Sequence, residues 1–183
     1  MGVSMYQSLI EFWFSDEASE RWFKSTPEFD RQLIERYSET WQAAKQRELD
    51  HWCDTATGSL AMVILLDQFP LNMFRGSAKS FSTEAQSRDV ARAAIDQGFD
   101  RELTAAQKSF LYMPFMHSEN IGDQALSLEL FDQPGLEENL RFARHHYDIV
   151  ERFGRFPHRN EILDRESTDA EIEYLNSKQG FKG

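Results

Sequence analysis

The sequence contains a single cysteine, Cys53, among 183 residues. One thiol cannot form an intramolecular disulfide, so the chain lacks the cross-linked framework of a small secreted domain. The stretch from Met1 to Ile10 also lacks the basic segment and the long apolar segment of an export signal. These absences predict a cytoplasmic protein.

Long apolar runs and an excess of basic residues are also absent. The longest uninterrupted apolar run is Leu60–Leu66, whereas a membrane span needs about twenty apolar residues. The chain has 20 basic and 31 acidic residues, which gives a net charge of -11. Such a charge repels a phosphate backbone. We therefore predict a soluble protein that binds neither a membrane nor nucleic acid.

Aromatic residues are abundant, with fifteen phenylalanines, five tyrosines and four tryptophans. They supply large burial areas at a low cost in side-chain entropy. A chain of this length buries roughly 70% of the surface that it would expose when unfolded. We predict one domain over residues 1–183, with a dense aromatic core.

The apolar residues recur at helical spacing, and no convincing alternating strand is present. This pattern predicts an all-α fold, a compact antiparallel array of about eight or nine helices. Leu60–Leu66 is apolar nearly all round, which predicts the buried central helix. The predicted helices are Leu9–Phe14, Phe29–Glu48, a helix capped by Ser59 that stops before Pro70, Thr83–Gln97, Thr104–Pro114, Ser118–Phe131 with Ser118 as its cap, Leu136–Phe153 and a short one after Thr168. Residues 16–27 and 69–80 are predicted to be connectors.

Local signals mark the ends of several of these helices. Capping boxes, in which the side chains of two residues three apart bond each other's backbone N–H, are predicted for three pairs. They are Thr83 with Gln86, Thr104 with Gln107, and Thr168 with Glu171. Gly98 and Gly154 are predicted to end helices in the left-handed conformation.

Some polar residues stand where a purely structural role is not obvious. Asp67 ends the most apolar helix, where the negative end of the helix dipole disfavours a carboxylate, so it needs a partner. Arg75 is the nearest basic candidate, and we predict a salt bridge, with a ligand-facing role as the alternative. His117 follows the Pro114 break among apolar residues, which favours its neutral form. His117 and the inward-pointing His146 each have a structural and a functional interpretation.

Known site motifs are missing. No His-Glu-x-x-His pattern occurs, no predicted helix carries a Glu-x-x-His pair, and there is no cysteine pair, so zinc and di-iron sites have no support. Phosphate-binding and dinucleotide-binding glycine loops and a nucleophile elbow are absent too. We predict no required metal or cofactor. A composite site of Asp67, His117 and His146 stays an open alternative.

The most distinctive segment is Phe153–Asn160, with the sequence FGRFPHRN. It holds two arginines, a histidine and an amide between aromatic rings. Gly154 and Pro157 fix an abrupt backbone path, which predicts a rigid polar loop. Function tends to lie on loops held by a rigid scaffold.

Three separated motifs, LDQFP at 66–70, PFMHSE at 114–119 and FGRFPHRN at 153–160, occur together with FWF at 12–14. In this order they resemble the bacterial family known as domain of unknown function 924, over nearly the whole chain. The resemblance implies an all-α fold similar to tetratricopeptide-repeat helical arrays, and no established activity. The family commonly has arginine after Pro70 and glycine after Leu163, where this chain has Leu71 and Asp164.

Three interpretations follow for the function. The first is a helical binding module with a pocket for a small molecule or a peptide end that carries a carboxylate or phosphate. The second is an enzyme, a hydrolase or isomerase with a histidine as general base. The third is a scaffold that binds another protein, with structural arginines and histidines. The candidate pocket residues are Asp67, Arg75, His117, Glu119, His146, Arg155, His158 and Arg159.

Overall fold

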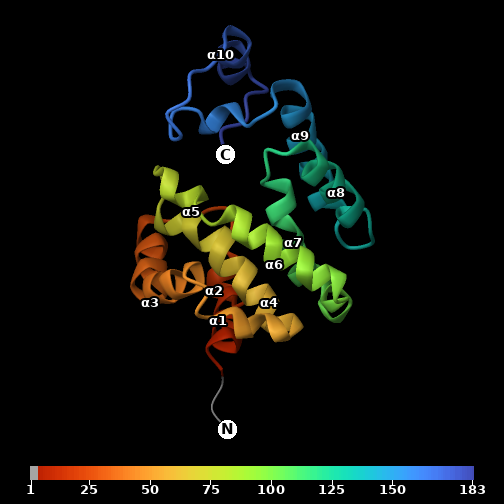
Figure 1. Ribbon diagram of the computed structural model, residues 1–183. Coiled ribbons are helices and arrows are strands. Elements are labelled where there is room, and N and C mark those ends of the chain that lie inside the picture. Colours follow the sequence, from red (N-terminus) through yellow and green to blue (C-terminus); the bar gives the residue numbers. More distant parts are fainter. Residues whose placement is uncertain (1–3) are drawn as a thin grey trace. The chain divides into compact units, whose positions relative to one another are not determined.

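A computed structural model of the protein describes residues 4–183. Over this range the chain is all-α and contains no strand (Figure 1). The helices are α1 (Met5–Trp13), α2 (Asp16–Ser19), α3 (Pro27–Lys45), α4 (Ala56–Val63), α5 (Phe69–Met73), α6 (Glu84–Asp96), α7 (Ala105–Met116), α8 (Ile121–Phe131), α9 (Glu137–Phe153) and α10 (Asp169–Asn176). None of the helices in this range has the length and apolar character needed to cross a membrane.

The chain forms two compact units. The N-terminal unit runs up to Arg75 and includes Lys79–Pro114, and the C-terminal unit consists of Gly76–Ala78 and Phe115–Gly183. The boundary therefore falls inside α7, at Pro114. That both units fold as one domain stays a prediction.

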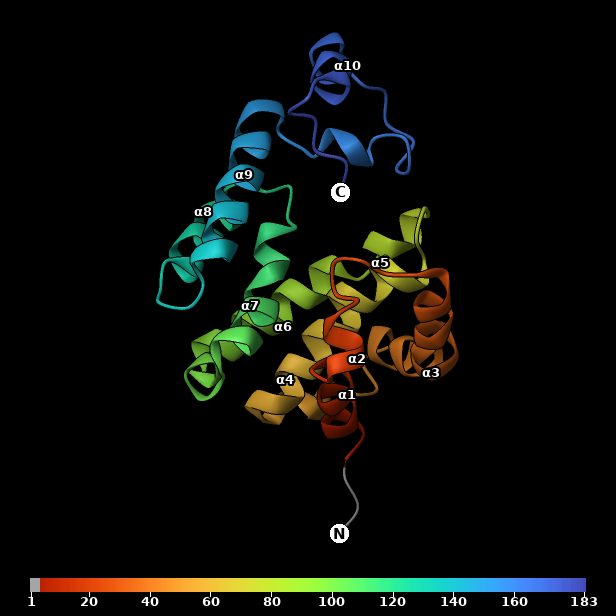
Figure 2. The same ribbon diagram turned by 180° about the vertical axis from the view of Figure 1, so that it is seen from behind.

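The core of the N-terminal unit surrounds α4, which packs against α1 and α6 (Figure 2). Every residue of Leu60–Leu66 is at most 1% exposed, which confirms the predicted central helix. Aromatic rings complete this core. Trp13 meets Phe69 and Phe110 edge-on, with centroid separations of 5.3 and 5.7 Å.

The central helix does not stop before Pro70, so that prediction was wrong. The chain continues through a π-helical turn, Ile64–Gln68, directly into α5, where Pro70 lies in the first turn. Proline is tolerated there because it needs no intrahelical donor at that position. Pro70 has no N–H for the carbonyl of Leu66, four residues earlier. The hydroxyl of Thr83 donates to this carbonyl instead, at 2.6 Å.

Competition for hydroxyl groups explains the caps that differ from prediction. Thr83 makes no side-chain cap, because its hydroxyl bonds Leu66 and accepts from Trp41 Nε1. Ser59 donates to the carbonyl of Cys53, and Thr55 caps α4 instead. A further predicted cap, Ser118, is replaced by Asn120, which caps α8.

Other local predictions are confirmed. Thr168 and Glu171 form a capping box, and Thr104 and Gln107 exchange the same two hydrogen bonds. Gly98 and Gly154 have φ values of 76° and 70° at the predicted helix ends. The connectors predicted at residues 16–27 and 69–80 were wrong in part, because these segments include the short helices α2 and α5. Pro114 lies inside α7 without ending it.

In the C-terminal unit, α8 and α9 lie side by side (Figure 1). A smaller apolar cluster joins α9 to α10 through Ile149, Val150, Phe156 and Tyr174. Asp164 has a φ of 53°. The resemblance expects glycine at this position, and the left-handed conformation explains why, since glycine adopts it without a steric cost. Aspartate tolerates this conformation better than most residues.

We expect Leu65→Ala to lower the free energy of unfolding by about 2 to 5 kcal/mol, because a fully buried leucine leaves a cavity in a closely packed core. Ile34→Ala is the control, since Ile34 is 42% exposed and should cost well under about 1 kcal/mol. Chemical denaturation of both variants measures the difference. A loss below about 0.5 kcal/mol for Leu65→Ala would contradict its place in the core.

Thr83→Val should lower the free energy of unfolding by about 2 to 6 kcal/mol. The change keeps the shape but leaves the Leu66 carbonyl and the Trp41 indole N–H without their buried partner, at about 1 to 3 kcal/mol each. Ser82→Ala removes the neighbouring exposed hydroxyl and should be nearly neutral. Equal losses for the two variants would show that the Thr83 hydroxyl does not support the helix past Pro70.

Candidate functional site

In the N-terminal unit, Arg75 does not pair with Asp67 as predicted. Its guanidinium binds Asp30 on α3 through two hydrogen bonds, of 2.8 and 3.2 Å. Ser25 and Asn72 donate to the same carboxylate, at 2.6 and 2.8 Å. Burial by itself would raise the pKa of Asp30, but these three donors lower it overall. Arg75 therefore anchors the end of α5 to α3.

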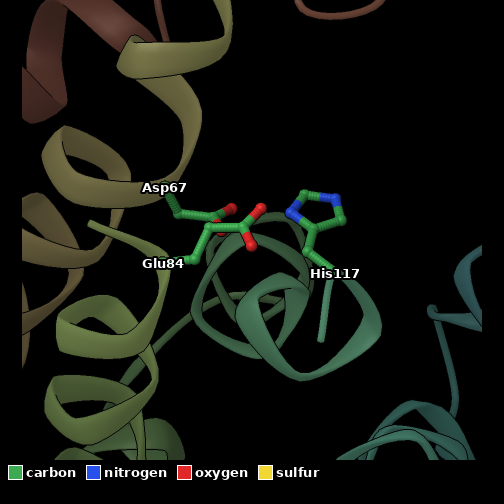
Figure 3. Close-up of side chains that lie close together, drawn as sticks. All are labelled: Asp67, Glu84 and His117. Atoms are coloured by element: carbon green, nitrogen blue, oxygen red, sulfur yellow. The ribbon is translucent and has the colours of Figure 1, made fainter. Parts of the chain in front are cut away.

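Asp67 is 1% exposed and accepts a 2.8 Å hydrogen bond from Gln68 Nε2. Glu84, in the first turn of α6, is 8% exposed. The two side chains point toward one another, with carboxylate oxygens within 4.8 Å (Figure 3). The figure also labels His117, which belongs to the C-terminal unit. Two acidic groups this close in the interior need compensating charge or hydrogen bonds.

In the C-terminal unit, the predicted polar loop is tied to the segment between α7 and α8. Arg159 Nη2 donates to the carbonyl of His117 at 3.0 Å, and the backbone N–H of Phe156 donates to Glu119 at 2.8 Å. Arg165 completes this link with a bidentate pair to Glu119, at 2.8 and 2.9 Å. Burial alone would raise the pKa of Glu119, but Arg165 and the Phe156 N–H lower it overall.

A second ion pair holds the loop to α10. Arg155 donates to both oxygens of Glu171, at 3.0 and 2.7 Å, and Asn160 adds a bond of 3.1 Å. The hydrogen bonds from Arg155 are the largest cause of the low pKa of Glu171, about 2. The predicted site residues that bind partners within their own chain thus include Arg75, Glu119, Arg155 and Arg159.

Two of the histidines, His146 and His158, lie against the rings of Phe156 and Phe181. His146 is 8% exposed, and its Nδ1 lies 2.8 Å from the carbonyl of Phe142. Its ring centroid is 6.5 Å from that of His117 and 4.9 Å from that of Phe181. His158 lies 4.9 Å from Phe181, perpendicular to it.

These surroundings favour neutral imidazoles. Burial lowers the pKa of His146 to about 3. Burial, followed by the charge of Arg159, lowers the pKa of His158 to about 4. The Nδ1 atom of His158 is buried and has no hydrogen-bond partner in the part of the chain that the structure describes. His146 and His158 are therefore largely uncharged at neutral pH, and Phe181 lies against both of them.

A recess of about 320 Å³ lies next to these histidines, between α9, α10 and the segment after α10. The residues that line it are His145, Asp148, Ile149, Arg152, Phe153, Tyr174 and Gln179. The guanidinium of Arg152 lies over the rings of Phe153 and Tyr174, at 4.7 and 5.8 Å from their centroids. His145 connects the recess to the histidines, since its ring is 6.2 Å from that of His146.

Comparison with known proteins identifies the family to which this chain belongs and a solved structure that resembles it. A family model described as bacterial protein of unknown function (DUF924) matches residues 9–179. The chain belongs to this family. A solved structure of a protein of unknown function from Agrobacterium tumefaciens is similar to it, with 41% identity and a TM-score of 0.90. The alignment covers 94% of this chain and 97% of the Agrobacterium chain. Comparison with curated proteins finds no significant match.

Sequence reasoning found the polar loop of this DUF924 member but missed several partners. Arg165 lies 46 residues from Glu119, and Arg75 lies 45 residues from Asp30. No local spacing indicates such pairs. Arg152 was missed as well, although its position beside Phe153 at the end of α9 was a usable signal for a cation over an aromatic ring.

The fold should lose stability as the pH falls from 7 to 5. A histidine whose pKa is lowered by folding contributes its full stability above its ordinary pKa of 6.5, and this contribution is lost at lower pH. For His146 the loss down to pH 5 is about 2 kcal/mol. The lowered pKa values of Glu119 and Glu171 act in the same direction, but only below about pH 4.5.

Denaturation curves at pH 7, 6 and 5 measure this dependence. His146→Gln should be less stable than the original chain at pH 7 but should lose less stability on acidification. His51→Gln is the control, because His51 is exposed and lies in the N-terminal unit, and it should follow the original chain. Identical slopes for all three proteins would exclude His146 as the source.

Proposed function

We propose that this chain is a cytoplasmic helical binding module that holds a small molecule, or a peptide end, carrying a carboxylate or phosphate. The recess of the C-terminal unit is the proposed site. Its volume of about 320 Å³ fits the lower end of the usual range for ligand pockets, about 300 to 1,000 Å³. Apolar walls with a few polar groups are the common composition of such pockets.

The state of Arg152 is the observation that carries the proposal. Arg75, Arg155 and Arg165 each bind a carboxylate of their own chain. Arg152 forms no ion pair with any described residue, and its guanidinium face rests on aromatic rings. Stacking occupies the face of a guanidinium but leaves its edge, where the N–H groups point, able to bind a carboxylate or phosphate.

The polar loop has a supporting role in this proposal. Its pairs with Glu119 and Glu171 fix the ends of α9 and α10, the two helices that line the recess. Asp67, Arg75, His117, Glu119, His146, Arg155, His158 and Arg159 stay predictions as ligand-binding residues.

The enzymatic alternative receives less support. A general base works best when its pKa lies near the working pH. The pKa values of His146 and His158, about 3 and 4, lie well below neutrality, so both are weak bases there. The scaffold alternative predicts binding of another protein and no stabilisation by small molecules, and the same experiment tests it.

A thermal-unfolding screen with small carboxylates and phosphates tests the proposal. A ligand at 100 times its dissociation constant should stabilise the fold by about 2.7 kcal/mol. Arg152→Gln should abolish this gain. Arg144→Gln should keep it, because Arg144 is an exposed arginine two turns earlier on α9 and does not line the recess. Stabilisation that persists in Arg152→Gln, or none with any compound, would contradict the proposal.

A further inference from the structure

The recess carries two opposite charges on one helix. Asp148 and Arg152 are one turn apart on α9, and both line the recess. An acidic residue four positions before a basic one commonly forms an ion pair on a helix. Here neither side chain forms an ion pair with any residue that the structure describes, and Arg152 lies over Phe153 and Tyr174 instead. The opening therefore presents a carboxylate and a guanidinium that do not neutralise one another directly.

The surface between these charges is apolar. The rings of Phe153 and Tyr174 lie 5.1 Å apart at 48° to each other, and the buried Ile149 adds an aliphatic wall. Burial of an apolar group against such a surface is favourable, by an amount roughly proportional to the area removed from water. Asp148 would repel a ligand that carries only negative charge. This repulsion would be strongest for a dianionic phosphate.

We propose that the ligand of this recess is a free α-amino acid with an apolar or aromatic side chain. The inference rests on the proposed function and names its ligand. The ammonium group binds Asp148, the carboxylate binds the edge of Arg152, and the side chain packs on Phe153 and Tyr174. The net charge of the ligand is zero, as is that of the Asp148 and Arg152 pair. The modest volume of the recess suits a molecule of this size.

Three probes of matched shape test this assignment by calorimetric titration of the intact chain: phenylalanine, 3-phenylpropionate and phenethylamine. The second lacks the ammonium group and the third lacks the carboxylate. Phenylalanine should bind at least about tenfold more tightly than either, because each of the others leaves one charged group of the recess without its hydrogen-bond partner.

Two variants should then separate the contributions of the two charged side chains to binding. Asp148→Asn should weaken the binding of phenylalanine by about tenfold or more. The same variant should bind 3-phenylpropionate with unchanged or higher affinity. Arg152→Gln should weaken both. Glu151→Gln and Arg144→Gln are controls, since both alter exposed charges on α9 that do not line the recess. All four positions are exposed, so thermal unfolding should confirm an intact fold.

The outcomes of these titrations distinguish the amino-acid assignment from the proposed function on which it rests. Equal affinities for phenylalanine and 3-phenylpropionate, both sensitive to Arg152→Gln, would overturn the amino-acid assignment and leave an anion-binding module in place. Binding of phenylalanine that ignores Asp148→Asn would overturn the assignment as well. No binding of any carboxylate, here or in the wider screen, would overturn both.

Discussion

A helix that is apolar on every side is stable only when other elements enclose it, and Leu60–Leu66 imposes this condition on the N-terminal unit. The helices around it have to supply both apolar contacts and hydrogen bonds for its carbonyl groups. Thr83 and Ser87 of the α6 region do both, since their hydroxyls donate to Leu66 and Val63. The helix can therefore continue through a π-turn and a proline. In doing so it carries Asp67 and Gln68 into the interior.

The C-terminal unit is organised differently. Its apolar cluster is small, and two carboxylates, Glu119 and Glu171, collect donors from the polar loop and from Arg165. These pairs are partly shielded from solvent, so removing one partner leaves the remaining charge without compensation. The order of this unit thus depends on arginines that pair with carboxylates of their own chain. This is a structural use for a motif whose composition suggests a binding site.

The sequence was most informative where a structure is decided locally. The box at Thr168 and the left-handed glycines Gly98 and Gly154 depend on a few neighbouring residues, and all three were predictable. Thr83 and Ser118 looked like equally good caps. In the folded chain both hydroxyls donate to other acceptors instead. Thr83 donates to the carbonyl of Leu66, which is distant in the sequence, and Ser118 donates to the carboxylate of Asp123.

The same limit applies to charge pairs. The partner of an arginine is decided by the packing of helices, and a span of about 45 residues between Arg75 and Asp30 leaves no trace in local spacing. The all-α class, the buried helix and the polar loop followed from composition and periodicity. The recess did not, because it is formed by α9, α10 and Gln179 only after they have packed together.

The distribution of tryptophan gives the molecule a built-in reporter. All four tryptophans, Trp13, Trp22, Trp41 and Trp52, belong to the N-terminal unit. Their fluorescence therefore follows the environment of that unit alone, whereas circular dichroism at far-ultraviolet wavelengths sums the helices of both. Two unfolding curves recorded on one unlabelled sample can thus reveal whether the units lose their structure in a single cooperative step.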